Sequence, residues 1–149
     1  MTILESQIES SLPLTYDENG ETRGYFTGQK KSLTIATNYS IWEGRRGYVI
    51  AEYMVRGDPS GKESLYVSER TIGAEAKTET VLLKDCDLIE FDYLEKGLTK
   101  EDTKWVEQWG TTETEPGTVD IVPGRIRVHV RYRTWDHSVV IPVRVGAAT

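Results

Sequence analysis

The chain has 149 residues, a net charge of −6 and a single cysteine, Cys86. This length is typical of one domain that buries on the order of two-thirds of its unfolded surface. One cysteine excludes an internal disulfide and a cysteine-based metal site. No apolar run reaches the ~18 residues of a membrane span, and no signal peptide is visible. We therefore expect a soluble chain as given, with Cys86 buried and unreactive.

Positive charge is concentrated at the C-terminal end of the sequence. Residues 123–149 contain five arginines against one aspartate, a balance of +4, whereas the rest of the chain carries −10. An acidic body disfavours general binding to nucleic acid and attraction to anionic lipid. Any electrostatic role of the arginines is therefore expected to be local.

The first predicted element is a short helix over residues 1–12. Leu4, Ile8 and Leu12 are spaced four apart and form one narrow apolar stripe. Pro13 ends the pattern, because the residue before a proline is pushed out of the helical region. Twelve residues make a marginal helix in isolation. We therefore expect this helix to pack on the domain or to be the tail of a longer helix.

Most of the remaining sequence predicts β-structure. A polar loop with an Asn-Gly turn signal covers residues 16–22, and further turns are expected at 43–47 and 57–61. Alternating apolar residues or residues that favour strands predict strands over 31–37, 48–56, 64–70, 80–83 and 85–94. Loops are expected at 97–102 and 110–122. The sequence shows no internal repeat or linker, so residues 13–149 are predicted to form a single globular unit.

Two tryptophans follow the last of these strands. Trp105 and Trp109 are four residues apart, which places them on one face of a strand and roughly on one face of a helix. We predict that at least one is buried and anchors this segment to the sheet. The alternative is a pair of exposed aromatic residues that belongs to an interface.

The C-terminal region predicts a hairpin. In the run from Pro123 to Arg133, apolar residues alternate strictly with four arginines and one histidine, which indicates a half-buried strand. A polar connection, 134–137, leads to a second apolar run over 138–145. Pro142 lacks an N–H to donate and therefore favours an edge position or a bulge. The fold class predicted from all these elements is α+β, with a short N-terminal helix on a predominantly antiparallel sheet.

The arginine face has two interpretations. It is a solvated face whose charges pair across strands, or it docks an acidic partner through residues such as Arg127 and Arg131. The sequence offers few groups for catalysis. His129 lies among arginines, which disfavour its protonated form and would repel a metal ion, and Asp136-His137 is expected to make a local turn contact.

An acidic run over residues 85–92 lacks a recognisable cation-loop pattern, and solvated carboxylates are the favoured interpretation. No phosphate loop, dinucleotide fingerprint or nucleophile elbow is present. We therefore expect a non-enzymatic protein with no catalytic residue, metal or cofactor.

The order of motifs resembles the J-type minor pseudopilins of bacterial type II secretion and, more distantly, the minor type IV pilins. The resemblance runs from about Gly24 to Val145. It is carried by Tyr25-Phe-Thr-Gly28, by Leu83-Lys-Asp-Cys-Asp-Leu-Ile-Glu-Phe-Asp-Tyr-Leu94, by Trp105-Val-Glu-Gln-Trp109, and by Val122-Pro-Gly-Arg-Ile-Arg-Val128 with Val140-Ile-Pro-Val-Arg-Val145.

The resemblance implies a pseudopilin-like fold in which residues 1–12 are the remnant of a long apolar helix. This remnant would lie against the sheet and leave part of the stripe of Leu4, Ile8 and Leu12 exposed for partner subunits. The long helix, absent from this chain, would anchor the protein in the inner membrane, with the β domain in the periplasm. The implied function is structural: assembly with other minor pseudopilins at the pseudopilus tip, which helps export folded proteins across the outer membrane. The alternative is a soluble extracytoplasmic β-domain that binds a small ligand or a peptide, which should show a large apolar pocket.

Overall fold

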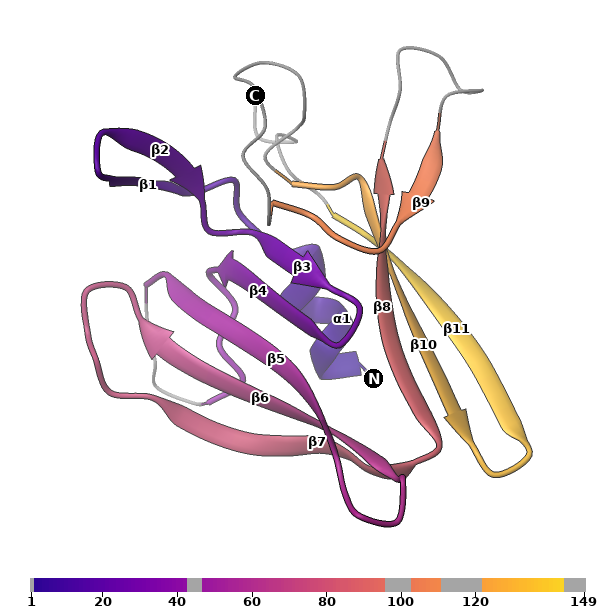
Figure 1. Ribbon diagram of the computed structural model, residues 1–149. Helices are drawn as coiled ribbons and strands as arrows, with labels where there is room; N and C mark the ends of the chain where they lie inside the picture. Colours follow the sequence, from indigo (N-terminus) through magenta and orange to yellow (C-terminus); the bar gives the residue numbers. More distant parts are fainter. Residues whose placement is uncertain (1, 43–46, 96–102, 111–121, 144–149) are drawn as a thin grey trace.

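The computed structural model describes residues 2–42, 47–95, 103–110 and 122–143, which form one helix and a series of antiparallel strands (Figure 1). The helix α1 spans Thr2–Glu9. The strands are β1 (Thr15–Glu18), β2 (Glu21–Gly24), β3 (Thr27–Gln29), β4 (Ser32–Thr37), β5 (Val49–Gly57), β6 (Glu63–Thr71), β7 (Thr78–Cys86), β8 (Leu88–Glu95), β9 (Lys104–Val106), β10 (Arg125–Tyr132) and β11 (Trp135–Pro142).

The strands form three sheets in which all pairings are antiparallel. The larger sheets have the orders β3-β4-β5-β6-β7 and β11-β10-β8-β9, and β1 pairs with β2 in a separate hairpin. The five-stranded sheet is a simple meander, whereas β10 in the four-stranded sheet lies between β8 and β11. Consequently β11 is an edge strand, as Pro142 predicted.

The expected pseudopilin-like α+β class is wrong. Strands account for 61% of the described residues, and the helix has only eight residues, so the fold is β-rich. One physical reason lies in the segment 16–22, which was expected to be a polar loop. Asn19 and Gly20 take positive φ angles there, as a two-residue hairpin turn requires, and β1 and β2 form on either side.

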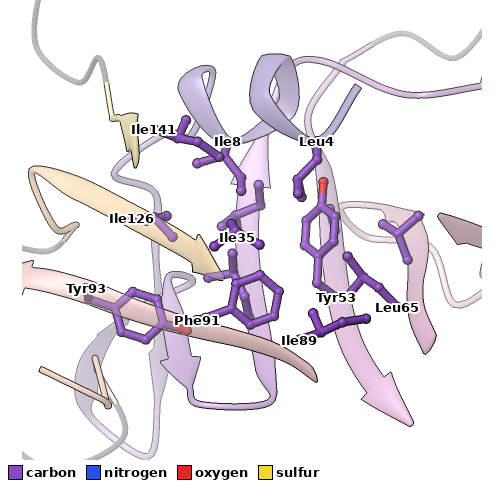
Figure 2. Packing of buried hydrophobic residues seen from close by; sticks show 14 of the residues in the cluster. Leu4, Ile8, Ile35, Tyr53, Leu65, Ile89, Phe91, Tyr93, Ile126 and Ile141 are labelled. Atoms are coloured by element: carbon purple, nitrogen blue, oxygen red, sulfur yellow. The ribbon is translucent and has the colours of Figure 1, made fainter. Parts of the chain in front are cut away.

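One hydrophobic core joins α1 to both larger sheets (Figure 2). The strict alternation in the sequence places its residues correctly: Leu33 and Ile35 are buried, as are Ile89, Phe91, Tyr93, Ile126, Val128 and Val130. Tyr132 was expected on the same inward face but is 38% exposed. It is the last residue of β10, where the hairpin of β10 and β11 ends in exposed residues.

A buried polar network fastens α1 to the five-stranded sheet. Gln7 donates from Nε2 to Oε2 of Glu69 at 2.7 Å and to the carbonyl oxygen of Tyr39 at 2.9 Å, and the Tyr53 hydroxyl donates to Oε1 of Gln7. Glu69 also accepts from the Ser40 hydroxyl at 2.6 Å. Gln7 and Glu69 have no exposed surface. Because an unmade hydrogen bond is costly inside a protein, this network fixes where α1 docks.

Candidate functional site

The most exposed apolar and basic side chains of the four-stranded sheet gather on the hairpin formed by β10 and β11. A two-residue turn, Arg133-Thr134, connects the strands, and Arg133 has a φ of +55°. We call the exposed arginine, apolar, tyrosine and tryptophan side chains of this element the hairpin surface, which comprises Arg125, Arg131, Tyr132, Arg133, Trp135 and Val140. Trp135 is 49% exposed and Val140 is 44% exposed.

The strand register distributes these side chains over two faces. The buried residues of β10 point to the core, so Arg125, Arg127 and Arg131 point to the outer face. Val140 lies opposite Arg127 and therefore shares this outer face. Trp135 lies opposite Tyr132 on the other face, where its indole ring stacks on His137 with the centroids 5.2 Å apart.

Arg127 is held by its neighbours within the sheet. Its Nε donates to Oδ1 of Asp92 at 2.9 Å, its Nη2 contacts Oδ2 of the same carboxylate, and its guanidinium lies 4.3 Å from the centre of the Trp105 ring. The hydrogen bonds that Arg127 donates to the Asp92 carboxylate raise the pKa of its guanidinium. Arg127 was predicted to be an interface residue, and the structure instead gives it a partner inside its own sheet, as the solvated-face interpretation expects.

Arg131 and Arg125 differ from Arg127. Both side chains are exposed, and neither forms an ion pair with any residue in the described part of the chain. Arg131 is also one of the charges that lower the pKa of Asp87. A role of Arg131 in binding a partner stays a prediction, and Arg125 is a second exposed cation on the same face. The guanidinium groups of Arg131 and Arg125 stand at the end of long, flexible side chains, which can reach beyond their own strand.

The contacts of the two histidines differ from the local turn contact that was expected at Asp136-His137. Asp136 lies in β11 and contacts Nε2 of His129 across the sheet, whereas His137 stacks on Trp135. The expectation that Asp136-His137 lies in a turn and makes a local contact there is therefore wrong, because both residues belong to β11. The connection between β10 and β11 is shorter than the residues 134–137 that the polar composition suggested, because strand pairing continues to Tyr132 and Trp135.

Most of the apolar stripe of α1 lies in the hydrophobic core. Leu4 is 2% exposed and Ile8 has no exposed surface, so neither is available to a partner on the folded domain. Leu12 lies beyond the helix and is half-buried, with its N–H donating to the carbonyl oxygen of Ala36 at 2.8 Å. The exposed apolar residue of α1 is Ile3, at 47%. The predicted interface is wrong for Leu4 and Ile8, because both pack in the core between the two larger sheets. For Leu12 it stays a prediction.

The predicted tryptophan anchor is confirmed for Trp109. This side chain is 6% exposed, and its backbone forms a two-way bridge with Gly28 of β3, with N–O distances of 2.8 and 2.9 Å. Trp109 thereby joins the segment after β9 to the five-stranded sheet. Trp105 is half-buried beneath the Arg127 guanidinium.

The acidic run around β8 is neutralised by cations. Asp87 contacts Nζ of Lys62 and accepts the backbone N–H of Arg133 at 2.8 Å, which together lower its pKa. Glu90 lies 3.7 Å from the ammonium group of Lys31. Among the described residues, no three histidine, cysteine or carboxylate side chains are arranged to hold a metal ion.

Cys86 is 4% exposed, as expected. Burial and the nearby carboxylates of Asp87 and Asp85 raise the pKa of its thiol. A raised pKa leaves little thiolate at neutral pH, so the group is a poor nucleophile.

A shallow hollow of about 200 Å³ lies on the outer face of the four-stranded sheet. Its lining comprises Lys30, Glu90, Phe91, Asp92, Glu107, Arg127, His129 and Ser138. Several of these charged groups already pair with one another or with neighbours. Pockets for drug-sized ligands typically have volumes of ~300–1,000 Å³ and apolar walls. This hollow is smaller and more polar, and it does not meet the expectation for the ligand-binding alternative.

The exposed edge of β11 was not identified as a binding element from the sequence. Pro142 was the available signal, since it indicated an edge position, but the exposure of Trp135 and Val140 follows from where the core ends. No described helix is long and apolar enough to span a bilayer. No family model matches this chain, and no curated protein sequence matches it.

Proposed function

We propose that this protein is a non-enzymatic structural subunit that works by assembling with other proteins, and that its assembly is the tip of a type II secretion pseudopilus. The hairpin surface is the observation that supports assembly with other proteins. It combines exposed aromatic and apolar groups with Arg125 and Arg131, which form no ion pair within the described residues and lie on β10, next to the edge strand β11. Aromatic residues and arginine are the residue types that contribute most to protein–protein binding.

The assignment to the pseudopilus tip rests on the ordered sequence motifs from Gly24 to Val145. It does not rest on the pilin-like fold that those motifs implied. In this proposal the β domain lies in the periplasm and is tethered to the inner membrane through an apolar helix, and its partners are the other minor pseudopilins. The tip complex then contributes to export of folded proteins across the outer membrane.

The experiment is a mixing assay with the purified periplasmic domains of the other minor pseudopilins of the source organism. Co-elution on size exclusion is expected for the wild-type protein. Replacing Arg125 and Arg131 with glutamine should weaken the complex and its dependence on salt, because exposed charges are screened over about 8–10 Å. Arg127 is unsuitable for this test, since its loss would leave Asp92 unpaired within the sheet.

The matched control replaces Arg56 and Lys77 with glutamine. Arg56 lies in β5 and Lys77 directly precedes β7, and the two cations pair with Glu79 and Glu52 of the five-stranded sheet. Their removal changes the net charge by the same amount. The control should leave co-elution intact. Failure of the wild-type protein to bind any of the minor pseudopilins would overturn the assignment to the pseudopilus.

A further inference from the structure

We infer that β11 is a strand-addition site that accepts an extended protein segment alternating acidic and apolar residues. The inference rests on the proposed function and specifies how the hairpin surface holds its partner. In the described part of the chain, β11 pairs with β10 on one side and with no strand on the other (Figure 1). An unpaired edge presents backbone donors and acceptors in a row, which a further strand can bind.

The register shows which backbone groups face outward. The carbonyl oxygen of Arg131 accepts the N–H of Asp87 on the β8 side at 2.8 Å, so the backbone of Arg131 faces β8. Arg131 lies opposite Asp136. Arg131 and Asp136 therefore exchange no backbone hydrogen bonds with each other, and the N–H and carbonyl groups of Asp136 face the open edge.

The same orientation recurs at every second residue of β11. Ser138 and Val140 follow Asp136 in this alternation and direct their backbone N–H and carbonyl groups outward. Pro142 is the next residue in the series, and it has no N–H to present. The open edge thus offers three residues whose outward N–H groups pair with no strand in the described part of the chain, and it ends at a proline, over a strand length of about 20 Å.

The side chains beside this edge define the chemistry of the occupant. On the outer face, β11 itself carries Asp136, whose carboxylate already has a partner in the sheet, and the adjacent strand β10 carries Arg131 and Arg125, which form no ion pair among the described residues. On the opposite face, Trp135 is half exposed and Val139 is partly buried. An added strand that alternates carboxylates with apolar side chains would direct its carboxylates to the arginines and its apolar groups to Trp135 and Val139.

A second copy of this chain is a poorer fit to the same edge. Pairing β11 with itself would bring two arginine-bearing hairpins together, and like charges across an interface oppose association. The carboxylate within β11, Asp136, already contacts His129 of its own sheet. An acidic segment from a different protein therefore complements the surface better.

Ser138→Pro provides the central test, because it removes an outward N–H and leaves the groups that bond to β10 in place. Ser138→Ala is the matched control, since it keeps that N–H. The probe is the blocked peptide Glu-Val-Glu-Val-Glu-Val-Glu, titrated into isotopically labelled protein and followed by NMR. We expect amide shifts at Asp136, Ser138 and Val140, with affinity falling about tenfold in Ser138→Pro and unchanged in Ser138→Ala.

Three outcomes would overturn the inference. The first is equal binding by the wild-type protein and a correctly folded Ser138→Pro variant. The second is equal binding of the peptide with lysine in place of glutamate. The third is a wild-type homodimer that Ser138→Pro dissociates, since the edge would then belong to a second copy.

The mixing assay separates this inference from the proposed function. If the pseudopilin complex forms equally well with Ser138→Pro, the strand-addition inference is wrong and the proposed function still holds. If the peptide binds at β11 but no pseudopilin complex forms, the proposed function is wrong and the strand-addition inference still holds.

Discussion

The ring of Tyr93 lies directly against the backbone of Gly28, where an added Cβ on the glycine would be 2.2 Å from Cζ of the ring. The Tyr93 hydroxyl lies 2.8 Å from the carbonyl oxygen of Gln29 and 3.0 Å from that of Ser32, so its single proton is shared between two acceptors. Tyr93 belongs to β8 of the four-stranded sheet, and Gly28 belongs to β3 of the other. This contact therefore sets how closely the two larger sheets approach at this position.

Gly28→Ala is expected to destabilise the fold by about 1–3 kcal/mol, the usual cost of overpacking a core. Gly57→Ala is the control, because it also lies in a strand but an added Cβ would have its nearest neighbour at 3.9 Å. Chemical denaturation of both variants provides the measurement. Equal midpoints for the two variants would contradict the close contact.

Trp109→Ala is expected to cost about 3–5 kcal/mol, in the range for removal of a buried aromatic side chain. Trp105→Ala should cost less, because its half-buried ring contributes mainly the contact with Arg127, worth about 0.5–1 kcal/mol at an exposed site. The free energies of unfolding of the two variants test this order. A larger loss at Trp105 would show that Trp109 is not the anchor.

Ile8→Ala should destabilise the protein by about 2–5 kcal/mol, because the side chain lies in the core between the sheets. Ile3→Ala on the same helix should change stability by less than about 0.5 kcal/mol, as is usual for exposed positions. Thermal or denaturant unfolding measures both. Similar small effects at the two positions would mean that α1 does not dock as the structure shows.

Stability is expected to fall at alkaline pH because of two buried tyrosines. Burial, and then the negative charge of Glu69, raise the pKa of Tyr53 well above the ordinary 10.0. Burial, and then Asp92, raise the pKa of Tyr93. When the folded pKa exceeds the unfolded one, the folded state binds the proton more tightly, so the contribution is complete below about pH 10 and is lost as pH rises further.

Unfolding free energies measured between pH 8 and pH 11.5 test this dependence. Tyr53→Phe and Tyr93→Phe should each flatten the alkaline decline, although each also loses the hydrogen bonds of its hydroxyl. Tyr48→Phe, at a position that is 52% exposed, is the control. A decline of unchanged slope in both core variants would exclude these two tyrosines as its cause.

Local alternation determined much of this fold. The residues Ile89, Phe91, Ile126 and Val128 were assigned to the buried face from a period of two, and each is almost completely buried. Pro142 likewise indicated the edge position of β11. Such features are local, because side-chain direction in a strand depends only on the parity of the sequence, and a proline lacks its N–H in every context.

Tertiary structure decided the rest. The spacing of Leu4 and Ile8 predicts an apolar stripe but contains no information on which surface covers it, and the two sheets of this protein bury it completely. Arg127 and Arg131 are equivalent in the sequence pattern, yet Asp92 and Trp105 hold the first while the second stays exposed. The difference arises from strand order, because the pairing of β10 with β8 places a carboxylate opposite Arg127 and Leu88 opposite Arg131.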